Sequence, residues 1–105
     1  MITKYETCVG DVAVDYSAMR LWLDGVEIKL TNTEFKILRE LTLNAGKVIE
    51  HETLMERVWG KEYQGNRNYL HQYIWSIRRK LGQYKQLSGC IRNVAGVGYR
   101  FDCTH

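Results

Sequence analysis

The alternation of apolar and polar positions along residues 67–82 predicts an amphipathic helix. At about 100° per residue, four aliphatic side chains share one narrow sector that must be buried: Leu70, Ile74, Ile77 and Leu81. The opposite side carries amides, hydroxyls, cations and aromatics, namely Asn68, Gln72, Trp75, Ser76 and Arg79, flanked by Tyr69, His71 and Arg78. A solvated helix usually interleaves both signs of charge, but residues 66–81 contain no Asp or Glu. The pattern therefore favours a polyanionic partner.

Two shorter helices are predicted ahead of it. Thr31 and Glu34 form a capping box, in which the Thr31 hydroxyl accepts from the Glu34 amide and the carboxylate reaches back to the Thr31 amide. Apolar side chains then recur at steps of three and four until a glycine-containing stop signal, which predicts a helix over residues 32–44. A second apolar stripe, followed by a glycine, predicts a helix over residues 51–59.

The N-terminal part predicts a small antiparallel sheet. Over residues 5–30, apolar residues alternate with polar or small ones. Asp24-Gly25 is a hairpin signal, because glycine tolerates the positive φ of a turn that matches strand twist. Residues 47–49 are long enough only for a linking strand.

A second hairpin is predicted over residues 90–102. Alternating residues lie on either side of Gly96-Val97-Gly98, and we expect both glycines to serve the tight reversal. A hairpin directly after a basic helix is typical of a wing. The chain contains no proline, repeat or low-complexity run, so residues 1–105 are predicted to form a single domain.

Composition narrows the class of protein. With 45% hydrophobic residues in 105, the chain can build a real core. It has neither an apolar run near the roughly 18 residues of a membrane span nor a signal-peptide core, so we expect a cytoplasmic protein without membrane contact. Cys8, Cys90 and Cys103 are odd in number and lack C-x-x-C spacing. They predict unlinked thiols rather than a disulfide framework or a zinc site.

The charge is unevenly distributed. Residues 61–100 hold eight basic residues and one acidic residue, a net +7, whereas the remainder holds seven basic and eleven acidic residues, a net −4. This asymmetry confines any attraction for phosphate to the C-terminal part of the chain.

Enzymatic motifs are incomplete. His51-Glu52 begins like the zinc-protease motif H-E-x-x-H, but Met55 stands where the second ligand is required. Gly96-Val97-Gly98 begins like a dinucleotide fingerprint, but Phe101 occupies the place of the third glycine. His71 lacks a Cys or carboxylate partner at i+3 or i+4, so a DNA-facing or solvated histidine is expected. We expect no enzymatic activity, catalytic residue, cofactor or metal.

Several linked motifs occur at characteristic separations between about Val9 and Phe101. In chain order they are Leu30-Thr31-x-x-Glu34-Phe35-x-x-Leu38, Asn44-Ala45-Gly46-Lys47-Val48, Leu54, Val58-Trp59-Gly60, Ile77-Arg78-Arg79-Lys80-Leu81 and Gly96-x-Gly98-Tyr99-Arg100-Phe101. Together they closely resemble the OmpR/PhoB winged-helix DNA-binding domain of two-component response regulators. Tyr69-Leu70-x-x-Tyr73 is similar to the KdpE branch, which governs potassium-transport genes. The resemblance implies an α+β winged helix-turn-helix fold with an N-terminal antiparallel sheet, three helices and a C-terminal wing.

The resemblance also implies that the helix over residues 67–82 lies in the major groove, while the wing, residues 91–101, touches the adjacent minor groove or its phosphates. The base-reading candidates are Tyr69, Gln72 and Ser76. Gln72 can pair bidentately with adenine, and a serine hydroxyl can donate to or accept from either base type. The phosphate-contact candidates are Trp59 through its indole N–H, Asn68, Tyr73, Trp75, Arg78, Asn93 and Tyr99. Face geometry and charge add Arg67 and Arg79.

Some positions depart from the family pattern. Many relatives have an Arg at the position of Asn68, a His at Tyr73, basic residues at Trp75 and Ser76, and a wing Arg at Ala95. An arginine is the side chain best suited to a narrow minor groove, so modest non-specific affinity is expected without it. Trp75 is expected to press against sugar or a thymine methyl, or to contact a partner protein.

The implied partners are those of a bacterial transcription regulator. We expect double-stranded promoter DNA, bound as a monomer on a half-site and as two head-to-tail copies on tandem direct repeats. RNA polymerase is expected to contact the loop over residues 60–66. A sensor kinase acts through a receiver domain that this sequence lacks, so an excised effector domain or a stand-alone regulator is expected. The alternative is a winged-helix protein-interaction module that grips another protein with Tyr69, Tyr73 and Trp75.

Overall fold

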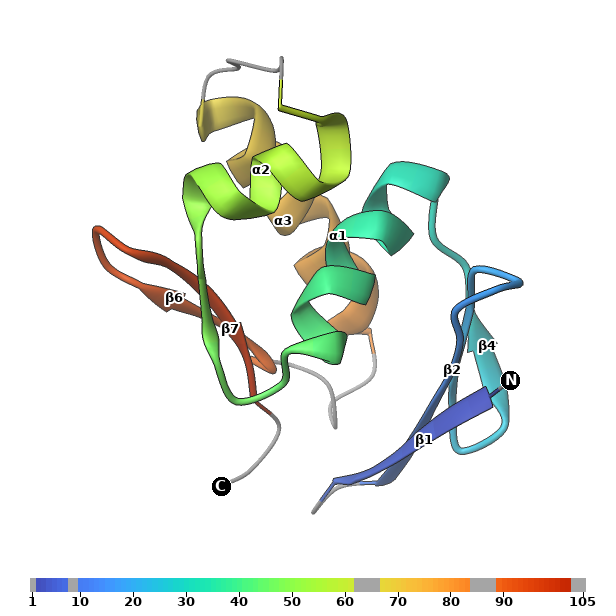
Figure 1. Ribbon diagram of the computed structural model, residues 1–105. Coiled ribbons are helices and arrows are strands. Elements are labelled where there is room, and N and C mark those ends of the chain that lie inside the picture. The colour runs from blue at the N-terminus through green and yellow to red at the C-terminus, as the bar shows by residue number, and fades with distance from the viewer. Residues whose placement is uncertain (1, 8–9, 62–66, 84–88, 103–105) are drawn as a thin grey trace.

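Three helices lie between two small sheets in the computed structural model, with the N-terminal sheet on one side and the wing on the other (Figure 1). The structure describes residues 2–7, 10–61, 67–83 and 89–102, with side chains described from Val12 onward. Buried aliphatic and aromatic side chains from both sheets and all three helices form one core cluster. The α+β winged-helix architecture predicted from the sequence is confirmed.

The N-terminal sheet is a four-stranded antiparallel meander. Its strands are β1 (Ile2–Thr7), β2 (Gly10–Asp15), β3 (Arg20–Leu23) and β4 (Val26–Ile28), in the order β1-β2-β3-β4. The predicted turn is confirmed, because Asp24 and Gly25 both adopt positive φ, 47° and 84°. Val12, Val14, Leu21 and Leu23 point into the core. The sheet begins earlier than expected, at Ile2 rather than at residue 5.

Helix α1 (Asn32–Leu43) begins at the predicted capping box and presents its apolar face to the core. The Glu34 N–H donates to the Thr31 hydroxyl (3.3 Å), and the Thr31 N–H donates to Glu34 Oε1 (2.8 Å). Phe35, Leu38 and Leu41 are at most 2% exposed. Helix α2 (His51–Trp59) follows and ends before Gly60, whose φ is 98°.

Helix α3 (Arg67–Leu81) and a three-stranded sheet complete the fold. The sheet contains β5 (Val48–Glu50), β6 (Ile91–Val94) and β7 (Gly98–Phe101), in the order β5-β7-β6. The linking strand predicted over residues 47–49 is therefore part of the wing sheet. Strands β6 and β7 form the wing hairpin.

The two wing glycines serve different purposes, so assigning both to the turn was wrong. Gly96 adopts φ 76° in the reversal, where a Cβ would meet no atom within 4 Å. Gly98 lies in β7, opposite Glu50 of β5, where a Cβ would lie 1.9 Å from the Ile49 carbonyl oxygen. Gly98 is thus required by close packing of β5 against β7.

The prediction of unlinked thiols was wrong for Cys90. This residue is 3% exposed and disulfide-bonded, and its partner lies outside the described residues, as do Cys8 and Cys103. The odd number of cysteines misled the prediction, because an odd count does not exclude a disulfide between two of them. The Asp102 N–H donates to the Cys90 carbonyl at 2.7 Å.

Two negative findings hold for the part of the chain that the structure describes. No helix there is both long and apolar enough to cross a bilayer. No group of three His, Cys, Asp or Glu side chains is arranged there to hold a metal ion.

Candidate nucleic-acid interface

Helix α3 is fixed to the core by the stripe predicted from its periodicity. Leu70 and Ile77 are fully buried, Ile74 is 1% exposed and Leu81 is 2% exposed. The polar side chains on the other side of the helix face outward or lie at its margins. The amphipathic orientation predicted for residues 67–82 is thus confirmed.

The three predicted base readers differ in how freely they face solvent. Gln72 is exposed, Tyr69 is 48% exposed, and Ser76 is half-buried. Gln72 and Ser76 line a shallow hollow together with Asn68, His71 and Trp75. On their other flank the same two residues line a second hollow that extends to the start of α1. Gln72 and Ser76, one helical turn apart, thus lie between two hollows on the outer side of α3.

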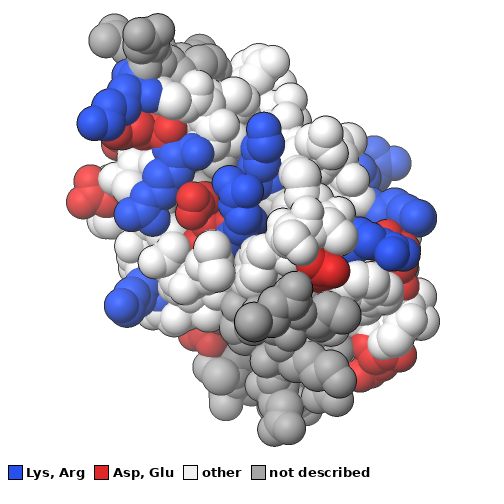
Figure 2. Space-filling model, turned by 45° about the vertical axis from the view of Figure 1, so that its right-hand side comes forward, with Lys and Arg blue, Asp and Glu red and all other residues white. Residues whose placement is uncertain are grey.

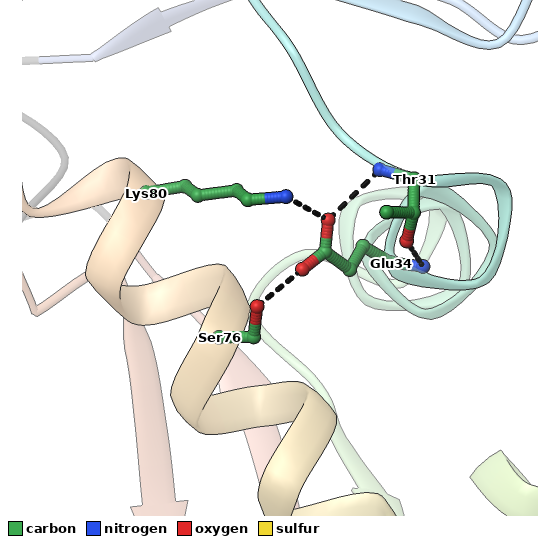
Figure 3. Close-up of polar contacts among 4 residues, drawn as sticks. All are labelled: Thr31, Glu34, Ser76 and Lys80. Atoms are coloured by element: carbon green, nitrogen blue, oxygen red, sulfur yellow. Dashed lines mark hydrogen bonds and ion pairs between the residues drawn. The ribbon is translucent and has the colours of Figure 1, made fainter.

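Ser76 is held by Glu34 of α1, a contact that periodicity did not reveal. The Ser76 hydroxyl donates to Glu34 Oε2 at 2.5 Å, and Lys80 Nζ donates to Glu34 Oε1 at 2.6 Å. The Thr31 N–H also donates to this carboxylate (Figure 3). The capping box therefore also ties the beginning of α1 to the exposed side of α3.

The cations of α3 are each in contact with another group. Arg67 donates to Glu52 of α2 through Nε (3.0 Å) and Nη2 (2.5 Å), and Lys80 pairs with Glu34. Arg78 donates to the Ile91 carbonyl of the wing through Nη2 (2.9 Å). The Arg79 guanidinium lies 5.5 Å from the Trp75 ring centroid. Within the described residues, Arg78 and Arg79 form no ion pair, so their charges stay available to an anion.

Trp75 is the most exposed large apolar side chain among the described residues, at 62%. The contact with Arg79 one turn later supports this unusual exposure, because a cation over an indole face is favourable. Trp75 and Arg79 thus present a flat aromatic surface with a positive charge beside it.

An aromatic cluster joins α2 to the first turns of α3. The Trp59 ring lies 5.9 Å from that of Tyr69 and 5.7 Å from that of Tyr73, and the two tyrosine rings are 5.6 Å apart. Trp59 and Tyr73 are half-buried. Pairs at these separations stabilise the helix contact beyond their buried area, so the cluster fixes where Tyr69 is presented.

The two contact residues predicted in the wing differ in exposure to solvent: Asn93 is exposed and Tyr99 is buried. Asn93 is exposed on β6. Tyr99, for which a phosphate contact was predicted, is only 2% exposed, and its hydroxyl is hydrogen-bonded to His71 Nδ1. Burial raises the pKa of Tyr99, so it is a neutral phenol at neutral pH. In this structure Tyr99 supports His71 on the exposed side of α3 and does not itself face solvent.

His51 packs against both His71 and Tyr99. Its ring centroid is 5.6 Å from that of His71 and 5.5 Å from that of Tyr99. Burial lowers the pKa of His51, with a further contribution from the charge of Arg67. This keeps His51 neutral at neutral pH, so it adds no charge to the interface.

The acid-free face of α3 contrasts with ordinary surface on the molecule. Lys and Arg side chains are interleaved with Asp and Glu over the face shown in Figure 2, as is typical of a solvated surface. The Arg20 ion pair with Glu27 at 2.6 Å is of this kind. Exposed pairs of this type contribute little to stability, because water and salt screen them.

Sequence reasoning missed the groups behind the interface. Glu34 and Lys80 were predicted only as a cap and as part of a basic motif, and His71 only as a solvated or DNA-facing residue. Lys80 follows Ser76 by one helical turn, so their shared direction was predictable. The identity of the carboxylate facing them was not, because Glu34 is 42 residues away from Ser76.

Comparison with known proteins matches residues 25–101 to the family described as "Transcriptional regulatory protein, C terminal". The chain is 35% identical over 89 residues to the transcriptional regulatory protein KdpE of Mycobacterium tuberculosis, covering 85% of this chain and 39% of that protein. The solved response regulator DrrB of Thermotoga maritima, an OmpR/PhoB homologue, is 32% identical with a TM-score of 0.77, covering 94% of this chain and 44% of that one.

A third solved structure has the same fold at lower sequence identity. The DNA-binding domain of RstA from Klebsiella pneumoniae, solved in complex with the RstA box, has a TM-score of 0.78 at 23% identity, covering 96% of this chain and 98% of that one. The chain spans about two fifths of the length of the curated relatives it matches. With the family match and the fold in agreement, the chain belongs to the OmpR/PhoB family of response-regulator DNA-binding domains.

Proposed function

We propose that this chain is a sequence-specific DNA-binding effector domain, with α3 in the major groove and the wing on the adjacent minor groove or its phosphates. The observation that carries the proposal is the exposed, acid-free side of α3, opposite a stripe that is at most 2% exposed. A helix held in this way can enter a duplex without leaving the core. The RstA domain, which shares the fold, was solved with its DNA box.

The proposed roles follow the geometry. Gln72, Ser76 and Tyr69 read base edges, because they lie on the exposed strip of α3. Backbone contacts are assigned to exposed or half-buried groups that can donate to phosphate or pack on sugar, namely Trp59, Arg67, Asn68, Tyr73, Trp75, Arg78, Arg79 and Asn93. Tyr99 contributes through His71. No step of this function requires a catalytic residue, cofactor or metal.

The context in the whole protein is also proposed from the family. A preceding receiver domain would pass the signal of a sensor kinase in the cytoplasm, and two copies would bind tandem direct repeats head to tail on a promoter. The predicted RNA polymerase contact at residues 60–66 falls largely outside the described residues, which resume at Arg67. Only Gly60 and Lys61 of that loop are described.

Duplex binding is expected to depend steeply on salt. If the interface neutralises about 4 to 6 phosphates, the logarithm of the association constant falls with the logarithm of salt concentration at a slope of about −4 to −5. Fluorescence anisotropy with a random duplex at several salt concentrations measures the slope. A slope near zero, or no binding at low salt, would contradict the proposal.

Base reading and backbone anchoring are expected to separate by mutation. Gln72→Ala should cost about 1 to 3 kcal/mol on the preferred duplex and relax preference at one base pair. Arg78→Ala should weaken binding to all duplexes alike, because it loses a phosphate contact and its bond to the wing carbonyl of Ile91. Both expectations are tested by measuring the affinity of each mutant for the preferred duplex and for duplexes that differ from it at one base pair. Uniform losses for both mutants would refute the assigned roles.

The second candidate function is a protein-interaction module. The observation that favours it is the exposure of Trp75 and Tyr69, at 62% and 48%, which would suit a protein partner equally well. The salt titration separates the candidates, because a module of this kind gives no steep salt dependence with DNA.

A further inference from the structure

The buried carboxylate of Glu34 lies directly behind the base-reading strip of α3. Glu34 is 2% exposed, so it cannot itself meet a duplex. Among the described residues three groups donate to it, and two of them, Ser76 and Lys80, belong to α3 (Figure 3). The third is the Thr31 N–H at the beginning of α1, at 2.8 Å. A residue of the first helix is thus in contact with a residue that reads DNA.

The protonation state of Glu34 fixes the direction of its hydrogen bonds. Burial by itself would raise the pKa of Glu34, but the Lys80 ammonium, the Ser76 hydroxyl and the Thr31 N–H outweigh it and hold the pKa below its usual value. The group is therefore a carboxylate at neutral pH and has no proton to donate. Ser76 must be the donor in the 2.5 Å contact.

This direction changes what Ser76 offers to a base. A serine hydroxyl has one proton and two acceptor lone pairs. With its proton directed to Glu34, the Ser76 oxygen presents only lone pairs to the groove. In the major groove, the donors that match an acceptor are the amino groups of adenine and cytosine, whereas guanine O6 and N7 and thymine O4 are themselves acceptors.

We propose that Glu34 is a positioning residue that sets base preference: by taking the Ser76 proton, it makes Ser76 select an amino-bearing base, adenine or cytosine, on the strand it contacts. The inference rests on the proposed function, since it requires α3 to lie in the major groove. It also narrows the expectation from sequence, in which Ser76 could pair with either base type.

The test compares base preferences of three proteins by selecting bound duplexes from a random pool. The wild type should prefer adenine or cytosine over guanine or thymine at one position by roughly 3- to 10-fold, the contribution of one hydrogen bond. Ser76→Ala should lose this preference. Glu34→Gln should lose it or invert it toward guanine or thymine, because the glutamine amide can donate to Ser76 and free its proton. The preference at the Gln72 pair should remain in both mutants.

Glu52→Gln is the matched control. It also removes a carboxylate in contact with α3, at Arg67, but touches no proposed base reader. It should leave every base preference unchanged. A change at the Ser76 position in this control would show that lost charge, not proton direction, determines the preference, and would overturn the inference.

A second measurement holds even if Glu34→Gln fails to fold. The selected adenine is replaced by purine without its 6-amino group, or the selected cytosine by 2-pyrimidinone, and affinity is measured with wild type and Ser76→Ala. The wild type should lose roughly 3- to 10-fold and Ser76→Ala should lose nothing. Equal losses for both proteins, or selection of guanine or thymine by the wild type, would overturn the inference while leaving DNA binding intact. Absence of salt-dependent duplex binding would instead overturn the proposed function, and this inference with it.

Discussion

Gly98→Ala is expected to lower the free energy of unfolding by about 2 to 4 kcal/mol, because overpacking against rigid backbone cannot be relieved by a rotamer change. The added Cβ would lie 1.9 Å from the Ile49 carbonyl oxygen and 2.9 Å from Glu50 Cα. Strand β5 would have to separate from β7. Because β5 leads directly into α2, and the His51 N–H donates to the Val97 carbonyl, the start of α2 would move too.

The matched control for this prediction is Gly96→Ala in the same hairpin. Gly96 has φ 76° and open space around its Cα, so alanine costs only the strain of a left-handed backbone, about 1 to 2 kcal/mol. Thermal denaturation measures both, with roughly 4 to 8 °C expected per kcal/mol for a chain of this size. Equal melting temperatures for the two mutants would mean that β5 and β7 are not as closely packed as in this structure.

The contrast between the two glycines shows what a sequence pattern can determine. The alternation around Gly96-Val97-Gly98 predicted a hairpin, and the hairpin is there. The same pattern could not distinguish a glycine needed for its φ from one needed for close approach. That difference depends on β5, because Gly98 pairs there with Glu50, which lies 48 residues earlier in the chain.

Local signals were reliable wherever one element contains the whole interaction. The capping box, the Asp24-Gly25 turn and the apolar stripe of α3 each involve neighbours within a few residues, and all three are confirmed. Helix bounds agree within a residue because caps and glycines terminate helices locally. The fold class followed from these elements and from the resemblance that their linked motifs carry.

Long-range contacts could not be predicted, and they determine much of the site. Helix α3 itself contains no acidic residue, yet Glu34 of α1 pairs with Lys80 and Glu52 of α2 pairs with Arg67. The positive charge of the helix is therefore partly balanced from outside. The interior position of Tyr99 likewise depends on the packing of the wing against His71. Such contacts join residues that no periodicity relates.

The carboxylates of Glu34 and Glu52 pair with some cations of α3 and not with others. Arg67 and Lys80, at the two ends of the helix, are held by carboxylates, whereas Arg78 and Arg79 contact a carbonyl oxygen and an indole ring. Pairing with a phosphate costs less for a cation that need not first leave a carboxylate. We therefore expect an anion to bind α3 preferentially near Arg78, which contacts the wing, and near Arg79.

Leu70→Ala is expected to lower the free energy of unfolding by about 2 to 5 kcal/mol, since it removes a fully buried side chain and leaves a cavity beneath α3. Affinity for DNA should then follow the folded fraction, with unchanged base preference in the molecules that remain folded. Gln72→Ala, two residues away on the exposed side, should change stability by no more than about 0.5 kcal/mol while weakening binding to the preferred duplex.

Urea denaturation and anisotropy on the same two variants give the comparison. We expect each mutant to impair one property only, because the buried side of α3 packs on the core whereas the exposed side is the one proposed to recognise DNA. A Leu70→Ala protein as stable as the wild type, or a destabilised Gln72→Ala protein, would mean that the helix does not present these faces as the structure shows.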